Sequence, residues 1–143
     1  MNYNLRFTKA LASFIILVLF VGLAALPVQA GVVEGNKGKG GQPIDVQQFV
    51  KPGKITIIDF YSKYCPPCEK IGELLKSVAQ KNPKVHVVKI DINRPGVEGI
   101  DFNSPLSKQY NLSFVPFLKI FDEQGKLKAE GQEAIGMAIE MNK

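Results

Sequence analysis

Residues 55–68 read Ile55-Thr56-Ile57-Ile58-Asp59-Phe60-Tyr61-Ser62-Lys63-Tyr64-Cys65-Pro66-Pro67-Cys68. The first half is an apolar, β-branched run, which predicts a buried strand. The cysteine pair that follows opens an amphipathic helical pattern, so the pair is expected at a strand-to-helix turn. The chain has no other cysteine. A Cys-x-x-Cys pair at such a turn can hold one reactive thiol and a second thiol that closes a disulfide with it.

The expected helix start explains why Cys65 should be the reactive thiol. Free backbone N–H groups and the helix dipole stabilise an anion there, so the pKa of an exposed Cys65 thiol should fall. Cys68 follows one turn later, more covered, where it can attack a mixed disulfide formed at Cys65. Pro66 suits an early helix position, which needs no N–H donor, and Pro67 stiffens the turn.

The first thirty residues have the pattern of a secretory signal peptide. Arg6 and Lys9 form a positive start, residues 10–28 carry no charge, and Val28-Gln29-Ala30 suits a cleavage site. We therefore expect cleavage after Ala30 and an exported protein, either periplasmic or membrane-anchored and facing the periplasm. An uncleaved anchor stays open as an alternative, because nineteen uncharged residues could just span a bilayer.

Size and charge limit the possible functions. The 143 residues are enough for one domain with a single core. Without Arg6 and Lys9, 16 basic residues face 13 acidic ones, a net charge of about +3. This small, scattered excess does not predict nucleic-acid binding. A lone Cys-x-x-Cys is a poor zinc site, so neither a metal nor a cofactor is expected.

The rest of the pattern predicts alternating helices and strands. Residues 31–43 are rich in Gly and Lys and predict a flexible tether, which would lead into a domain over residues 44–143. The expected elements are a short helix from Asp45, a strand over 55–61, a helix from the cysteines to Asn82, a strand over 85–92, a short helix from Ser104 to Tyr110, a strand over 114–121, a returning strand over 126–130 and a helix over 133–141.

Three separated segments resemble the thioredoxin family, and within it the exported or periplasmic thioredoxin-like proteins. They are Ile57 to Cys68, which ends in Cys-Pro-Pro-Cys, then Val88-Lys89-Ile90-Asp91, and Tyr110-Asn111-Leu112-Ser113-Phe114-Val115-Pro116-Phe117. A Cys-x-x-Cys alone is weak evidence, whereas three segments in the right order are specific. The resemblance implies an α/β, thioredoxin-like fold over 44–143: a central mixed β-sheet flanked by helices, in a single domain after an N-terminal signal peptide.

The resemblance also implies roles for particular residues. Asp59 matches the family's buried acid, which helps deprotonate the resolving Cys68, and Lys89 matches the lysine near that acid. Pro116 matches the cis-proline beside the sulfurs, which would present the backbone of Val115 to an extended substrate. The redox-active disulfide would be Cys65–Cys68. The residues expected to contact substrate are Tyr64, Pro66, Pro67, Val115 and Pro116.

The sequence departs from the family pattern in ways that bear on partner choice. It has no Trp near the active site, where Tyr61 and Tyr64 stand instead. The residues between the cysteines are Pro-Pro rather than the usual Gly-Pro. The loop over 93–103 is longer than in a minimal thioredoxin, and the N-terminal strand of the fold is expected to be shortened or lost.

The expected function is an exported thiol–disulfide oxidoreductase that reduces protein disulfides. It would act as a monomer and draw electrons from a membrane thiol reductant. The resemblance suggests that its substrates are apocytochrome c or other exported proteins. Two alternatives stay open: the same site working as a disulfide donor or isomerase, and a thioredoxin-fold binding module whose disulfide is static. The direction depends on the reduction potential, which the sequence does not supply.

Overall fold

The computed structural model describes residues 31–143, and the predicted signal peptide over 1–30 lies outside them. One mixed sheet has the strand order β1-β3-β2-β4-β5. Its strands are β1 (Val32–Glu34), β2 (Ile55–Tyr61), β3 (Val85–Asp91), β4 (Phe117–Phe121) and β5 (Leu127–Glu130). The helices are the 3-10 helix η1 (Val46–Phe49), α2 (Pro66–Lys81), α3 (Pro105–Gln109) and α4 (Gly131–Met141). Within residues 31–143, no helix is both long and apolar enough to cross a membrane.

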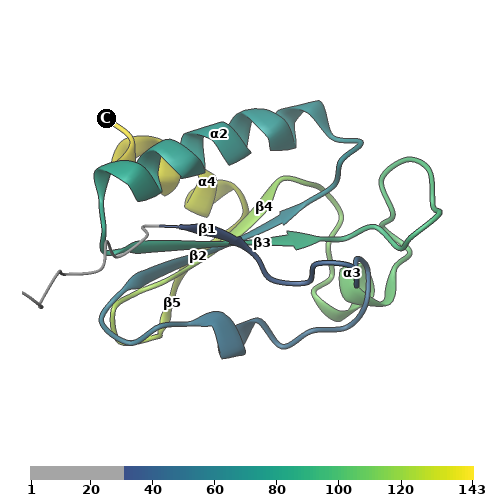
Figure 1. The fold of residues 1–143 in the computed structure, drawn as a ribbon, viewed down its shortest axis with the longest axis horizontal. Coiled ribbons are helices and arrows are strands. Elements are labelled where there is room, and N and C mark those ends of the chain that lie inside the picture. Colours follow the sequence, from purple (N-terminus) through teal and green to yellow (C-terminus); the bar gives the residue numbers. More distant parts are fainter. Residues whose placement is uncertain (1–30) are drawn as a thin grey trace, which may run out of the picture.

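The sheet separates two layers of helix and loop. Figure 1 shows α2 and α4 over one face, and η1 and α3 on the other side. Strands β1, β3 and β2 run parallel, whereas β4 and β5 are antiparallel to their neighbours. This is the mixed sheet flanked by helices that the resemblance implies.

Strand β2 lies at the centre of the sheet, and its side chains fill both cores. Ile57 packs with Leu75 of α2 on one face, and Ile58 and Phe60 pack with Leu106 of α3 on the other. All of these side chains are fully buried. A strand covered on both faces is apolar over most of its length, and this explains the run of residues from which β2 was predicted.

The glycine- and lysine-rich segment is folded, so the prediction of a flexible tether over 31–43 is wrong. Strand β1 pairs with β3, and the Asn36 side chain donates to the carbonyl of Asp91 (2.8 Å) and accepts from its N–H (2.9 Å). Gly40 allows close packing rather than movement, because a Cβ on it would lie 2.2 Å from the carbonyl oxygen of Asn93. The N-terminal strand of the fold is therefore present, although short.

Replacing Gly40 by alanine is expected to lower the free energy of unfolding by about 1–3 kcal/mol, because the added methyl group has no room. Urea unfolding of the oxidised protein measures the change. Gly136→Ala is the matched control: it lies inside α4 with nothing within 4 Å of the added carbon, and should stabilise by up to about 1 kcal/mol. Equal effects at the two positions would contradict the close packing of Gly40.

The other predicted elements agree with the structure to within a few residues. Ser104 caps α3 by accepting an N–H hydrogen bond from Ser107 at 3.1 Å. The largest difference is β4, which was expected from residue 114 and begins at Phe117. Pro116 precedes it and has no N–H for the strand ladder, so regular pairing starts only after the proline.

Candidate active site

Cys65 and Cys68 form a disulfide at the start of α2, with their Cα atoms 5.3 Å apart. Cys65 is the N-cap of the helix, and its Sγ accepts an N–H hydrogen bond from Cys68 at 3.2 Å. A backbone amide aimed at this sulfur favours its thiolate form once the disulfide is reduced. The local geometry therefore provides the stabilisation that the sequence predicts for Cys65.

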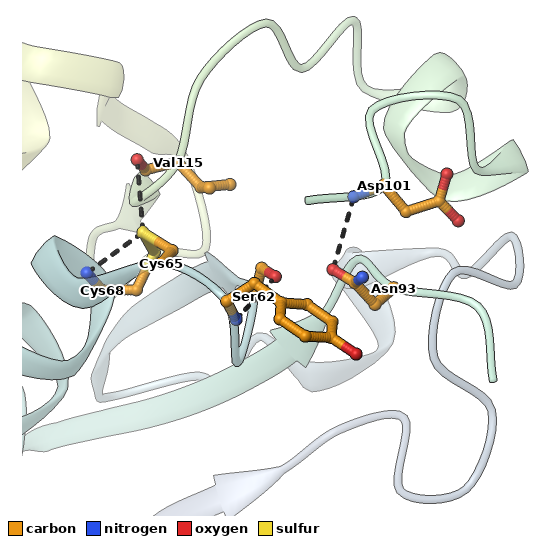
Figure 2. Close-up of a disulfide and its surroundings, with 7 residues drawn as sticks. Ser62, Cys65, Cys68, Asn93, Asp101 and Val115 are labelled. Carbon is orange, nitrogen blue, oxygen red and sulfur yellow. Dashed lines mark hydrogen bonds between the residues drawn. A yellow bond between two sulfur atoms is a disulfide. The ribbon is translucent and has the colours of Figure 1, made fainter. Parts of the chain in front are cut away.

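The burial of the two cysteines differs from the prediction. Cys65 was expected to be exposed and Cys68 covered, but in this oxidised state they are 4% and 3% exposed. The chain before β4 covers Cys65, and Figure 2 shows the carbonyl of Val115 directed at its sulfur, 3.6 Å away. The Val115–Pro116 peptide bond is cis, as the resemblance implies.

The predicted substrate-contacting residues lie around the disulfide at different depths. Tyr64, Pro66 and Pro67 are exposed, Val115 is half-buried, and Pro116 is buried. The turn that carries Tyr64 is shaped by Ser62, whose hydroxyl accepts an N–H hydrogen bond from Tyr64 at 3.2 Å. Sequence reasoning did not single out Ser62, although a serine just after a strand is a common turn residue.

Asp59 lies in the middle of β2 with none of its surface exposed. Within residues 31–143, neither of its carboxylate oxygens has a hydrogen-bond partner. Burial raises the pKa of Asp59 to about 7, while Lys89 acts in the opposite direction and Glu34 adds to the increase. Near neutral pH this carboxyl group can therefore both accept and release a proton, as a catalytic acid–base residue must.

Lys89 shares a surface cavity with the disulfide. The cavity has a volume of about 550 Å³, and its lining includes Cys65, Cys68, Tyr61 and Lys89. The Lys89 ammonium lies 4.0 Å from the centre of the Tyr61 ring and 4.0 Å from Glu34 Oε1. The cavity thus brings Lys89 next to the cysteines, and Lys89 is in turn the register partner of Asp59 on the neighbouring strand β2.

Glu34 is the site residue that sequence reasoning missed. It ends β1, and it was assigned to the flexible tether because glycine and lysine dominate the segment that follows it. The signal that could have identified the strand is the β-branched pair Val32-Val33 before it.

The loop over 93–103 is ordered beside this site. Arg94 Nε and Nη2 both donate to the carboxylate of Asp101, at 2.7 and 3.0 Å, and Arg94 holds the pKa of Asp101 below its usual value. Figure 2 shows Asn93 at the base of the loop, where its side-chain oxygen accepts from the N–H of Asp101 at 3.5 Å. The loop closes one side of a second cavity of about 310 Å³, which shares Tyr61 and Lys63 with the first.

Known proteins match both the sequence and the fold. The family model described as "Thioredoxin" matches residues 44–138. A thioredoxin of Mycoplasmoides gallisepticum is 26% identical over 83 residues, which are 58% of this chain and 74% of the relative. A chloroplastic F-type thioredoxin of Brassica napus is 31% identical over 75 residues, 52% of this chain and 37% of the relative. A protein disulfide-isomerase of Zea mays is 27% identical over 90 residues, 58% of this chain and only 16% of the relative.

Solved structures show the same fold at low sequence identity. Thioredoxin f from spinach chloroplast has a TM-score of 0.53 and 24% identity, with 78% of this chain and 89% of that chain covered. Oxidised thioredoxin O2 from Arabidopsis thaliana has a TM-score of 0.52 and 23% identity, with 77% and 90% covered. With a family model that matches most of the folded domain, this chain belongs to the thioredoxin family, and its Cys65–Cys68 pair is that of a thiol–disulfide oxidoreductase.

Proposed function

We propose that this protein is an exported thiol–disulfide oxidoreductase that reduces disulfides in other exported proteins. The observation that supports reduction rather than oxidation of substrates is the small number of hydrogen-bond donors to Cys65 Sγ. In the part of the chain that the structure describes, its sulfur accepts one hydrogen bond, from the amide of Cys68. Strong disulfide donors owe their potential to a highly stabilised reduced form. A single amide donor supports a potential nearer that of a reductant.

Reduction of a substrate proceeds by two exchanges. The Cys65 thiolate attacks one sulfur of the substrate disulfide, the substrate S–S bond breaks, and the departing substrate thiolate takes up a proton. Cys68, once deprotonated, attacks Cys65 Sγ and breaks the mixed disulfide, and the second substrate thiol leaves. Two electrons have passed to the substrate, and the protein holds the Cys65–Cys68 disulfide seen in the structure.

Asp59 would take the proton from Cys68 in the second exchange. Its carboxyl group is buried without a hydrogen-bond partner in the described chain, and its pKa of about 7 allows it to exchange a proton near neutral pH. Lys89 would steady the carboxylate that remains, since the two residues lie opposite each other on neighbouring strands. The proton would leave with the second substrate thiol or through the cavity beside Lys89.

The return of the protein to its dithiol form needs a second reductant. We propose a membrane-bound dithiol that faces the same compartment, which fits the predicted leader over residues 1–30. The substrates would be exported proteins with oxidised cysteine pairs, among them apocytochrome c. The scheme needs only one copy of this chain, and the protein would act as a monomer.

A trapping experiment tests this proposal. The tagged Cys68→Ser chain, expressed with its leader in bacterial cells, should accumulate mixed disulfides with exported proteins, identified by mass spectrometry after thiol alkylation. N-terminal sequencing should find Gly31 first if the leader is cleaved. Partners confined to the cytoplasm would contradict export.

The same site working as a disulfide donor or isomerase is the second candidate. The match to a protein disulfide-isomerase of Zea mays favours it. The equilibrium reduction potential separates this candidate from a reductase.

A further inference from the structure

One row of charged side chains crosses three neighbouring strands beside the disulfide. Glu34 of β1 is the register partner of Lys89 in β3, and Asp59 of β2 is the partner of the same lysine from the other side. Side chains of directly paired residues point to the same face of a sheet. Lys89 therefore stands between two carboxyl groups, Glu34 at the sheet edge and Asp59 at its centre.

The Lys89 ammonium contacts side chains at the outer end of the row, on the side of Glu34, rather than Asp59 at its centre. Its ammonium lies 4.0 Å from Glu34 Oε1 and 4.0 Å from the centre of the Tyr61 ring. The Tyr61 hydroxyl in turn donates to Glu34 Oε2 at 3.1 Å. Glu34 thus contacts the lysine through one oxygen and the tyrosine through the other, while Asp59 has no hydrogen-bond partner among residues 31–143.

The helix above the row leaves room for this arrangement. A Cβ on Gly72 of α2 would come within 3.9 Å of the Lys89 ammonium. The side chain of Lys89 is 25% exposed and that of Glu34 is 44% exposed. The pair is therefore accessible to water, in contrast to the fully buried Asp59.

We propose that Glu34 is a positioning residue, which holds the Lys89 ammonium at the outer end of the row and so limits how strongly its charge stabilises the Asp59 carboxylate. This inference deepens the proposed function at the same site, since it concerns the group that would take the proton from Cys68. The contacts of Glu34 are with Lys89 and Tyr61, and it acts on Asp59 through Lys89.

The groups that face Asp59 come from each element packed against it. Lys89 favours the charged form of the carboxyl group and Glu34 disfavours it, whereas burial is the largest influence. On the remaining side, the register partner in β4 is the apolar Leu118. From α2, Glu69 lines the cavity that holds Lys89, and it is exposed. Burial and Glu34 also raise the pKa of Tyr61, so the tyrosine stays protonated and remains a donor to Glu34.

The test is a direct titration of Asp59 in the full chain. The chain is labelled with ¹³C at the aspartate carboxyl carbons and held in detergent micelles, and the Asp59 signal is assigned from its loss in Asp59→Asn. Glu34→Gln removes the negative charge but keeps the shape of the side chain. The titration midpoint of Asp59 is expected to fall by about half a unit or more, because a like charge is lost and Lys89 is released toward Asp59.

Two further variants make the outcome decisive. Tyr61→Phe leaves β1 intact and keeps the ring beneath Lys89, so it should give a smaller fall in the same direction. Glu73→Gln, on the exposed side of α2, is the matched control and should leave the midpoint unchanged. An unchanged or raised midpoint in Glu34→Gln and Tyr61→Phe would overturn the assignment.

The titration needs no substrate, so it is independent of the direction of electron flow. The trapping experiment could contradict the proposed function while the titration midpoint of Asp59 still fell in Glu34→Gln. Conversely, the trapping experiment could support the proposed function while the midpoint stayed unchanged. If both hold, the pH profile of mixed-disulfide resolution should shift to lower pH in Glu34→Gln, in step with the midpoint.

Discussion

Replacing Cys65 by serine is expected to lower the rate of disulfide reduction to that of dithiothreitol alone. Cys65 is the helix N-cap, and its sulfur accepts the amide hydrogen bond from Cys68 that favours a thiolate. A serine hydroxyl has no comparable ionised form at neutral pH, so the first exchange has no nucleophile. Turbidity of reduced insulin, followed with the full chain in detergent, measures the rate.

The matched control for this prediction is Cys68→Ser. It keeps the attacking thiol and lacks the resolving one, so it should stop after the first exchange and hold the substrate as a mixed disulfide on a non-reducing gel. Substantial activity in Cys65→Ser would contradict the assignment of the nucleophile. Failure of Cys68→Ser to capture any substrate would favour the binding module with a static disulfide.

Asp59 is expected to make the folded protein less stable as the pH rises. Its pKa is about 7 in the folded chain against the ordinary aspartate value of 3.8, so between these values the folded state binds more protons than the unfolded state. Stability therefore decreases with increasing pH across this window. The size of the shift corresponds to a loss of about 2–4 kcal/mol between pH 4 and pH 8.

Urea unfolding of the oxidised protein at several pH values measures this loss. Asp59→Asn has no ionisable group at the site, so its stability should change much less between pH 4 and pH 8. The same variant should slow the release of a trapped mixed disulfide at neutral pH, because Cys68 loses its proton acceptor. If both proteins lose stability equally over this range, Asp59 does not titrate as the structure indicates.

The local parts of the fold could be predicted from the sequence because local patterns determine them. The apolar run predicted β2 at its observed bounds, and the proline after Ser104 predicted the start of α3. The cysteine turn was predicted for the same reason, since a strand, two prolines and an amphipathic stripe are adjacent in the chain.

Contacts between residues far apart in the sequence could not be predicted, because they depend on which segments lie side by side in the folded chain. Gly40 lies in a segment whose glycine content predicted flexibility. Only the position of Asn93 in the folded chain shows that a side chain would not fit at Gly40. Glu34 becomes part of the site only through the parallel register of β1 and β3, which no local pattern encodes. The contact of Val115 with Cys65 crosses fifty residues. A family resemblance, rather than spacing, led us to expect Pro116 beside the sulfurs, and the contact through Val115 itself was not predicted.

The equilibrium reduction potential of the Cys65–Cys68 pair tests the central claim most directly. The full chain would be equilibrated in a series of glutathione or dithiothreitol redox buffers. The fraction of chains in the dithiol form would then be measured by thiol alkylation. The account predicts a potential near or below about −250 mV, close to that of thioredoxin and suited to a reductase. A value between about −120 and −180 mV would contradict it and identify a disulfide donor or isomerase.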